Sequence, residues 1–204
     1  MGHFHSFRNR VREVVSDPLN LAIARHPLAG LVDEAGYVIL HPGTKVPLTG
    51  DQAYYDAVST LLVINRGVHE PLEEYAFQEA LAGLPAQPRM LELGAYWGHY
   101  SMWLKTVRPE AAVVLVEPDP ARLEVGQANF AHNGLEGEFV QANVAADGFT
   151  VDAFLDRHGW PHLDILHADI QGAEAVMLDG ARQALADRRV TRLFVSTHTQ
   201  PLHA

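Results

Sequence analysis

The 204-residue sequence contains no cysteine. This absence excludes a disulfide framework and a thiolate zinc site, so any bound metal must use histidine, aspartate or glutamate ligands. No apolar run approaches the ~20 residues that a membrane-spanning helix needs, and the first residues lack the apolar core of a secretory signal. We therefore expect a protein that does not enter a membrane, and the absence of cysteine fits a cytoplasmic location.

Positive charge is also scarce, with 15 basic against 25 acidic residues and a formal net charge of -10. A field of this sign repels phosphate backbones and anionic lipid, so we expect neither nucleic acid nor a membrane surface as a partner. The length and the 48% hydrophobic content suffice to bury one core, which predicts one domain of catalytic size.

Residues 1–88 carry mostly helical patterns. One face of the first expected helix carries the apolar residues Phe4, Phe7, Val11 and Val15. The other expected elements are a short helix from Asp17-Pro18, a hairpin over 36–47, and helices over 51–65 and 71–83. Two prolines, Pro85 and Pro88, then mark a linker, and we expect this helical segment to form a lid on the domain that follows.

From Arg89 onward, short apolar runs alternate with helical stretches, which is typical of a parallel sheet covered by helices on both faces. The runs that resemble buried strands are Met90–Leu93, Ala112–Val116, Glu138–Gln141, Leu163–Leu166 and Arg192–Val195. Helices are predicted after Asp119-Pro120, ending at Gly134, and over residues 173–186. Residues 89–204 are therefore predicted to form an α/β domain.

The first predicted strand ends in a glycine turn with the spacing E-x-G-x-x-x-G. The turn consists of Glu92, Leu93, Gly94, Ala95, Tyr96, Trp97 and Gly98. Because glycine has no Cβ, a ligand can approach the backbone closely. Dinucleotide sites use G-x-G-x-x-G to bring a pyrophosphate onto a helix N-terminus, so the spacing here favours a ligand without pyrophosphate. An ordinary strand-to-helix turn is the alternative.

Polar side chains follow the next two predicted strands. Glu117, followed by Pro118, stands where a carboxylate can accept hydrogen bonds from both hydroxyls of a ribose. Asp119 already caps the following helix, which leaves Glu117 for the ribose. Beyond the third strand, Asn143 and Val144 stand where the base of a nucleoside would lie, and the Asn143 amide offers a donor and an acceptor to adenine. A plain turn asparagine is the alternative.

The fourth and fifth strands end in side chains suited to proton transfer. Strand alternation puts His167 and Asp169 on one face, and His198 is expected beside them at the end of the neighbouring strand. A histidine there can accept the proton of an attacking hydroxyl. In an alternative interpretation, these three side chains hold a divalent metal. The charge of Glu174 is explained by its place in the first turn of a helix.

These residues together resemble the FkbM family of methyltransferases over about Met90 to His198. The most specific part is Leu163-Asp164-Ile165-Leu166-His167-Ala168-Asp169-Ile170-Gln171-Gly172-Ala173-Glu174, which is similar to the family's D-(L/I)-L-K-x-D-x-E-G-x-E segment. Glu117-Pro118 is similar to its E-P pair. The resemblance implies a Rossmann-like class I methyltransferase fold, S-adenosyl-L-methionine as the cofactor, and methyl transfer to a hydroxyl of a sugar, glycan, lipid or secondary metabolite.

The sequence departs from the family pattern at three places. His167 stands where the family usually has lysine and Gln171 where it usually has glutamate, so we expect the substrate end to differ. The fold normally adds a helix and two strands after the fifth strand, whereas this sequence ends at Ala204. Two explanations stay open, a truncated sequence or a short sheet. The missing edge is expected to be covered by the N-terminal segment or by the partner subunit of a homodimer.

The combined hypothesis is an O-methyltransferase that acts on a small-molecule or glycan acceptor without a metal. The expected cofactor residues are Glu92, Gly94, Ala95, Tyr96, Trp97, Gly98, Glu117, Pro118, Asn143, Val144 and Asp169. The expected catalytic residues are His198, Asp169 and His167. Two other classes stay open at this point, a nicotinamide-dependent oxidoreductase on the same sheet and a catalytically degenerate methyltransferase scaffold.

Overall fold

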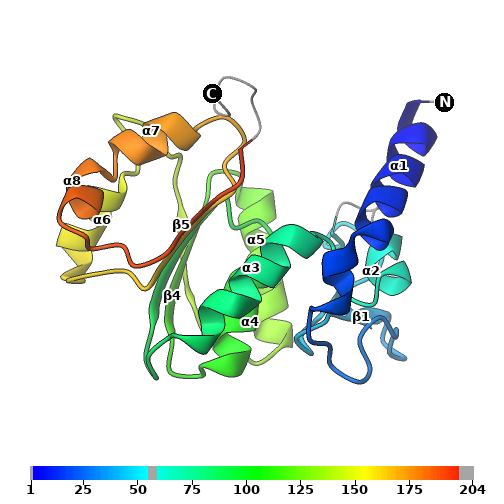
Figure 1. Cartoon of the computed structure of the whole chain (residues 1–204). Helices are drawn as coiled ribbons and strands as arrows, with labels where there is room; N and C mark the ends of the chain where they lie inside the picture. The colour runs from blue at the N-terminus through cyan, green and yellow to red at the C-terminus, as the bar shows by residue number, and fades with distance from the viewer. Residues whose placement is uncertain (1, 55–58, 198–204) are drawn as a thin grey trace. The chain divides into compact units, whose positions relative to one another are not determined.

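A computed structural model describes residues 2–54 and 59–197 (Figure 1). The chain divides into two compact units, Met1–Gly83 and Leu84–Ala204, close to the boundary predicted after residue 88. Across the described residues, no helix is both long enough and apolar enough to span a membrane.

The first unit combines helices with one small hairpin. Its elements are α1 (Gly2–Ser16), the 3-10 helix η1 (Pro18–Leu21), β1 (Tyr37–Ile39), β2 (Lys45–Pro47), α2 (Thr60–Ile64) and α3 (Pro71–Ala82). The predicted hairpin is confirmed, because β1 and β2 pair antiparallel. The predicted cap is confirmed as well, since the Asp17 carboxylate accepts a hydrogen bond of 2.8 Å from the Leu19 amide at the start of η1.

Two predictions in this unit were wrong in detail. In α1, Val14 is 3% exposed and Val15 is 43% exposed, so Val14 rather than Val15 continues the buried face. The helix predicted over 51–65 is shorter, because residues 51–54 form turns, α2 covers Thr60–Ile64, and residues 55–58 lie outside the described residues. The turn buries Tyr54 edge-on against the His69 ring, with centroids 5.2 Å apart, and this tertiary contact overrides the local helix pattern.

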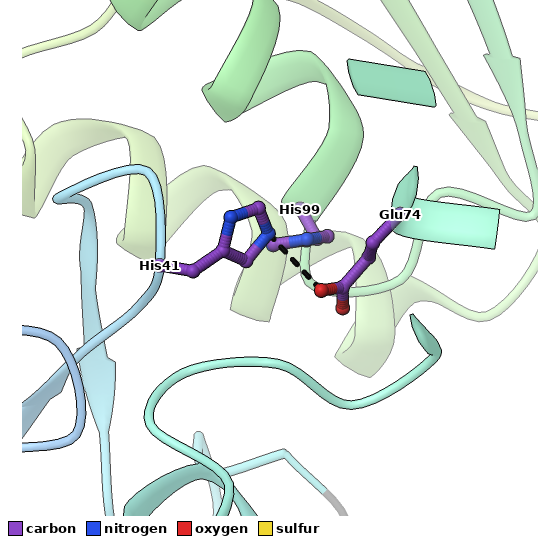
Figure 2. A group of neighbouring side chains, drawn as sticks. All are labelled: His41, Glu74 and His99. Atoms are coloured by element: carbon purple, nitrogen blue, oxygen red, sulfur yellow. Dashed lines mark ion pairs between the residues drawn. The ribbon is translucent and has the colours of Figure 1, made fainter. Parts of the chain in front are cut away.

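A buried carboxylate on α3 joins two histidines of the first unit. The Glu74 side chain lies 3.1 Å from Nε2 of His41, which follows β1, and Figure 2 shows this ion pair as a dashed line. Its other oxygen contacts Nδ1 of His69 and accepts the His69 amide at 3.0 Å. All three side chains are almost completely buried. The cluster therefore ties the hairpin and the loop before α3 to the buried face of that helix.

The second unit is built on a five-stranded parallel sheet with the order β5-β4-β3-β6-β7. The strands are β3 (Arg89–Leu93), β4 (Ala112–Glu117), β5 (Glu138–Gln141), β6 (Ile165–Ala168) and β7 (Leu193–Val195). The helices are α4 (His99–Val107), α5 (Pro120–His132), α6 (Val151–His158), α7 (Glu174–Asp179) and α8 (Arg182–Ala186). All five predicted strands are present, and β6 lies two residues later than predicted.

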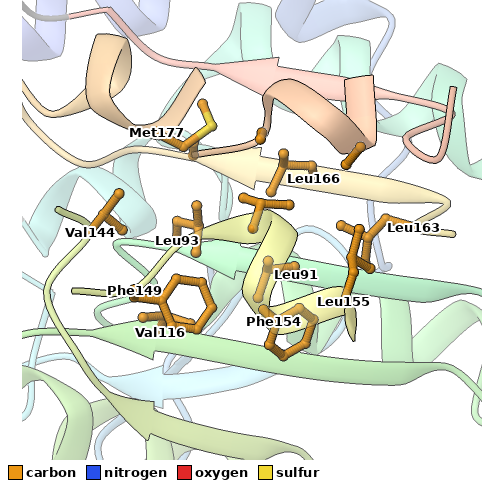
Figure 3. Close-up of a cluster of buried hydrophobic side chains, with 14 of the residues drawn as sticks. Leu91, Leu93, Val116, Val144, Phe149, Phe154, Leu155, Leu163, Leu166 and Met177 are labelled. Carbon is orange, nitrogen blue, oxygen red and sulfur yellow. The ribbon is translucent and has the colours of Figure 1, made fainter. Parts of the chain in front are cut away.

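Helices cover both faces of this sheet, as predicted. In Figure 1, α4 and α5 lie on one side of the strands and α6, α7 and α8 on the other. Because side chains alternate along a strand, Leu91, Leu93 and Leu166 point to the face covered by α6, α7 and α8. There they pack with Phe154 and Met177 in the core drawn in Figure 3. Each such side chain contributes about 1.5–3 kcal/mol when it is fully buried. The core thus fixes the strands whose ends carry the site.

The prediction of a single helix over residues 173–186 is wrong, because the structure has two helices there, α7 and α8, separated at Gly180. The Gly180 carbonyl accepts a hydrogen bond of 2.9 Å from the Asp152 amide on α6. The Asp152 carboxylate in turn accepts the amides of Gln183 at 2.9 Å and Ala184 at 2.8 Å. A carboxylate from another helix therefore caps α8 and ends the continuous helix.

Candidate cofactor site

The carboxyl ends of β3, β4, β5 and β6 meet at a topological switch point of the sheet. The chain runs outward from β3 to β4 and β5, and then crosses back to β6 on the other side of β3. Ligands of open parallel sheets bind at such points. A cavity of about 200 Å³ lies there. It is lined by Gly94, Val116, Glu117, Pro118, Arg122, Ala142, Asn143, Val144, Asp169, Ile170, Gln171 and Ala173.

The glycine turn reaches the cavity through Gly94. The amides of Gly94 and Ala95 donate to the Val116 carbonyl at 2.9 and 3.1 Å, which holds the turn against the end of β4. Gly94 has φ 72°, and a Cβ at this position would lie 1.9 Å from the Asp169 carbonyl oxygen. Glycine is therefore required by the close approach of the chain leaving β6, a reason that differs from the predicted approach of a ligand.

Glu117 is buried at the end of β4 and faces the cavity. Its two oxygens accept hydrogen bonds from the amides of Tyr96 and Asp119, each 3.2 Å long. The Asp119 side chain accepts the Ala121 amide at 2.9 Å, which confirms that Asp119 caps α5. A carboxylate has lone-pair sites for about four hydrogen bonds, so Glu117 retains capacity for the hydroxyls of a ribose.

Three other predicted cofactor residues line the same cavity, namely Pro118, Asn143 and Val144. The Asn143 side chain is exposed at its rim, whereas Val144 is buried. An apolar wall beside an amide suits a planar base that carries both donors and acceptors. The volume is below the roughly 300–1,000 Å³ of complete ligand pockets, so the cavity can enclose only part of a nucleoside cofactor.

The remaining predicted turn residues, Glu92, Ala95, Tyr96, Trp97 and Gly98, do not line this cavity. Glu92 is buried and accepts hydrogen bonds from the amide and hydroxyl of Ser101 in the first turn of α4. Gly98 starts α4 with φ 75°, and a Cβ there would lie 3.0 Å from the Phe130 ring. Glu92 and Gly98 therefore contribute to the shape of the turn and do not line the cavity.

At the predicted reacting end, only Asp169 among the described candidates lines the cavity. Its amide donates to the Leu93 carbonyl at 3.0 Å, which joins the end of β6 to β3. His167 lies opposite Glu92 in the strand register and is buried, with its ring centroid 4.2 Å from that of Tyr100. The structure therefore separates His167 from the cavity that Asp169 lines, although the sequence predicted both side chains on one face of the strand end.

The third predicted catalytic residue, His198, lies outside the described residues. The structure does confirm that β7 ends beside β6, because the two strands are parallel and the Ser196 amide donates to the Ala168 carbonyl at 2.9 Å. The alternative metal site at His167, Asp169 and His198 includes this residue and stays a prediction.

Six lining residues were not predicted as site residues from the sequence, and two of them, Arg122 and Gln171, have polar side chains. The Arg122 guanidinium carbon lies 5.3 Å from the centroid of the Tyr96 ring, within the range of a cation–π contact. Its position in the first turn of the helix that follows Glu117 is a signal that sequence reasoning could have used. Gln171 has φ 49°, a left-handed backbone for which the sequence offers only the neighbouring Gly172 as a hint.

A family model of the methyltransferase small domain matches residues 76–156. The matched stretch contains the glycine turn, Glu117 and Asn143. A search among curated proteins finds no match to this chain.

Solved methyltransferase structures show weak likeness. The precorrin-6y C5,15-methyltransferase of Geobacter metallireducens has a TM-score of 0.47 and 15% identity, with 64% of this chain and 65% of that chain covered. The TrmK protein of M. capricolum, in complex with S-adenosyl-homocysteine, has a TM-score of 0.44 and 10% identity, with 62% and 54% covered. A SAM-dependent methyltransferase of Agrobacterium tumefaciens has a TM-score of 0.45 and 15% identity, with 66% and 47% covered.

This chain covers less than two thirds of each of those three chains. The fold assignment rests on the strand order, the parallel pairing and the helices on both faces, together with the matched family model. The second unit has a Rossmann-like class I methyltransferase fold. The family match and the cavity beside Glu117 support S-adenosyl-L-methionine as the cofactor.

Proposed function

We propose that this protein is an S-adenosylmethionine-dependent methyltransferase that methylates a hydroxyl of a sugar, glycan, lipid or secondary metabolite. The observation that carries the proposal is the cavity at the switch point, which brings Gly94, Glu117, Asn143 and Asp169 together from the ends of four strands. Methyl transfer to oxygen in particular is supported by the resemblance of residues 163–174 to the FkbM family.

The lining residues suggest a division of roles. Glu117 would accept the ribose hydroxyls, Asn143 and Pro118 would border the adenine, and the backbone at Gly94 would border the rest of the cofactor. When bound, the cofactor supplies a methyl group on a sulfonium. Asp169 lines the cavity beside the end of β6. Its carboxylate is assigned to position the acceptor hydroxyl by accepting a hydrogen bond from it. The role of His198 as general base stays a prediction.

Three further features stay predictions alongside this function. Residues 1–88 would form a lid, which would exclude water from the reacting groups and align them. The subunits would pair as a homodimer, and the protein would work in the cytoplasm. Sedimentation velocity of the purified full chain tests the homodimer, and a mass of about one chain would contradict it.

Substitution of Asp169 tests the assigned chemistry. With labelled S-adenosylmethionine and a panel of hydroxylated sugars and metabolites, the Asp169→Asn variant should transfer methyl groups roughly 100-fold more slowly than the wild type. Because Asp169 also borders the cofactor cavity, the rates are compared with both proteins saturated with cofactor. The matched control is Asp179→Asn, at an exposed position on α7, which should keep the wild-type rate.

The products distinguish the proposal from its competitors. A methyl ether made by the wild type supports it, whereas methylation on nitrogen or carbon would refute the oxygen assignment. Tight cofactor binding without turnover on any acceptor would favour the scaffold. An unaltered rate in Asp169→Asn would remove that residue from the reaction.

A further inference from the structure

One face of α5 packs against the glycine turn. Arg122, Gly126 and Asn129 follow one another at helical spacing, so they lie on the same side of the helix. The Arg122 guanidinium lies over the Tyr96 ring. A Cβ at Gly126 would lie 2.7 Å from the Tyr96 carbonyl oxygen, and Nδ2 of Asn129 donates to the Trp97 carbonyl at 3.0 Å. Each of the three residues therefore touches the turn at Tyr96 or Trp97.

The backbone at Tyr96 needs such support. Tyr96 has φ 42°, in the left-handed region that side chains other than glycine rarely occupy, so the surroundings must hold this conformation. The Trp97 carbonyl precedes the first residue of α4, and a buried carbonyl needs a hydrogen-bond donor. Asn129, which is 1% exposed, supplies that donor from a different element. The packing of α5 thus fixes the shape of the turn.

The shape of the turn determines where the Tyr96 amide points. That amide donates to the Glu117 carboxylate at 3.2 Å, and Glu117 lines the cavity. Gly126 and Asn129 themselves do not line it. A route of direct contacts therefore leads from the buried face of α5, through the turn, to the carboxylate assigned to the ribose.

We propose that Asn129 and Gly126 are positioning residues that hold residues 96–97 so that the Tyr96 amide orients Glu117 toward the cofactor. The identity of the ligand in this inference rests on the proposed function, whereas the route through the turn does not. Arg122 lies on the same face, but it also lines the cavity, so its substitution would not separate positioning from direct contact.

The test uses two substitutions on this face and two matched controls off it. Asn129→Ala removes the donor to Trp97, and Gly126→Ala forces the Tyr96 carbonyl to move. The controls are Glu124→Ala and Gln127→Ala, both at exposed positions on other sides of α5. Each full-length protein is titrated calorimetrically with S-adenosylhomocysteine, and hydrogen exchange of the Tyr96 amide is measured by NMR without ligand.

We expect both on-face variants to bind S-adenosylhomocysteine about 10-fold more weakly and to exchange the Tyr96 amide faster, because the bond to Glu117 is loosened. The two controls should match the wild type in both measurements. Far-UV circular dichroism and urea unfolding verify that each variant is folded. Gly126→Ala keeps the inference testable if Asn129→Ala fails to fold, because it retains the Asn129 hydrogen bond.

Two results would overturn the inference. One is wild-type affinity and wild-type Tyr96 exchange in the on-face variants. The other is weakened binding with unaltered Tyr96 exchange, because the loss would then not pass through the turn. If the wild type itself binds no S-adenosylhomocysteine, the proposed function fails, and the exchange rates of the four variants alone decide the positioning role.

Discussion

In the proposed cofactor site, Glu117 is the residue assigned to the ribose hydroxyls. Removal of its carboxylate in Glu117→Ala should weaken S-adenosylhomocysteine binding by about 1 to 3 kcal/mol, because ribose hydroxyls would lose a charged acceptor in a buried place. Isothermal titration calorimetry measures the change. Glu124→Ala, at an exposed position on α5, is the control and should leave the affinity unaltered. Equal affinities in Glu117→Ala and the wild type would remove the ribose role.

The buried cluster of the first unit makes stability depend on pH. Burial raises the pKa of Glu74, but the charges of His69 and His41 and their hydrogen bonds outweigh it and hold the pKa well below its ordinary value of 4.5. Burial lowers the pKa of His69, but the charge and hydrogen bond of Glu74, with the charges of Glu70 and Glu73, raise it above 6.5. Ionised Glu74 and protonated His69 therefore stabilise each other in the folded state.

These directions set the pH range in which the cluster stabilises the fold. The contribution of Glu74 is complete above pH 4.5 and is lost as the pH falls toward its folded pKa. The contribution of His69 is complete below pH 6.5 and is lost as the pH rises through its folded pKa. Both contributions are complete only between these two values, so the cluster stabilises the first unit most at mildly acidic pH.

Glu74→Gln should lower the free energy of unfolding by about 3 to 5 kcal/mol in that range, because it leaves buried His69 without its counter-charge. Urea unfolding as a function of pH measures this. The difference from the wild type should decrease above pH 6.5 as His69 loses its proton. Glu79→Gln, exposed on α3, serves as the control. A difference that grows with pH would show that the sign is wrong.

For single residues, the sequence could predict features that depend on neighbours along the chain. The place of Glu117 at a strand end and the helix cap at Asp119 could be predicted, because both features are local. The reason for Gly94 could not be predicted, since the carbonyl that excludes a Cβ belongs to Asp169, in the chain leaving β6. The same holds for Glu74, whose partner His41 comes from the distant hairpin.

The break between α7 and α8 shows how a side chain of the neighbouring helix α6 can end a helix. Asp152→Ala should lower the free energy of unfolding by about 0.5–2 kcal/mol, because two amides at the start of α8 lose their acceptor. Chemical denaturation monitored by circular dichroism measures the loss. Asp156→Ala removes an exposed acid of the same helix that pairs with Arg189 at 3.2 Å, and it should cost less. An equal or smaller loss in Asp152→Ala would contradict the capping role.

Helix and strand existence could be predicted well because both depend on local patterns. The apolar strands and the capped helix α5 appeared where their residues indicated. The division of residues 173–186 could not be predicted, because the carboxylate that caps α8 lies on α6. The shortened α2 has a similar cause, since Tyr54 packs against His69.

In the whole molecule, the strand order determines where the cavity lies. The order β5-β4-β3-β6-β7 places the reversal between β3 and β6, and this reversal brings the glycine turn, Glu117 and Asp169 to one cavity. The α/β class and the alternation of elements predicted a sheet of this type. Side-chain placement was predicted less well, since His167 points into the packed aromatic side of the sheet beside Tyr100 rather than into the cavity.

The cavity beside Glu117 is proposed to bind S-adenosylmethionine rather than a dinucleotide. The most direct test is the thermal unfolding midpoint of the full chain, measured with increasing S-adenosylhomocysteine and, separately, with NADH. A ligand that binds only the folded state adds about 2.7 kcal/mol of stability at a concentration of 100 times its Kd. We predict that the midpoint rises with S-adenosylhomocysteine and does not change with NADH. Stabilisation by NADH alone would contradict the account.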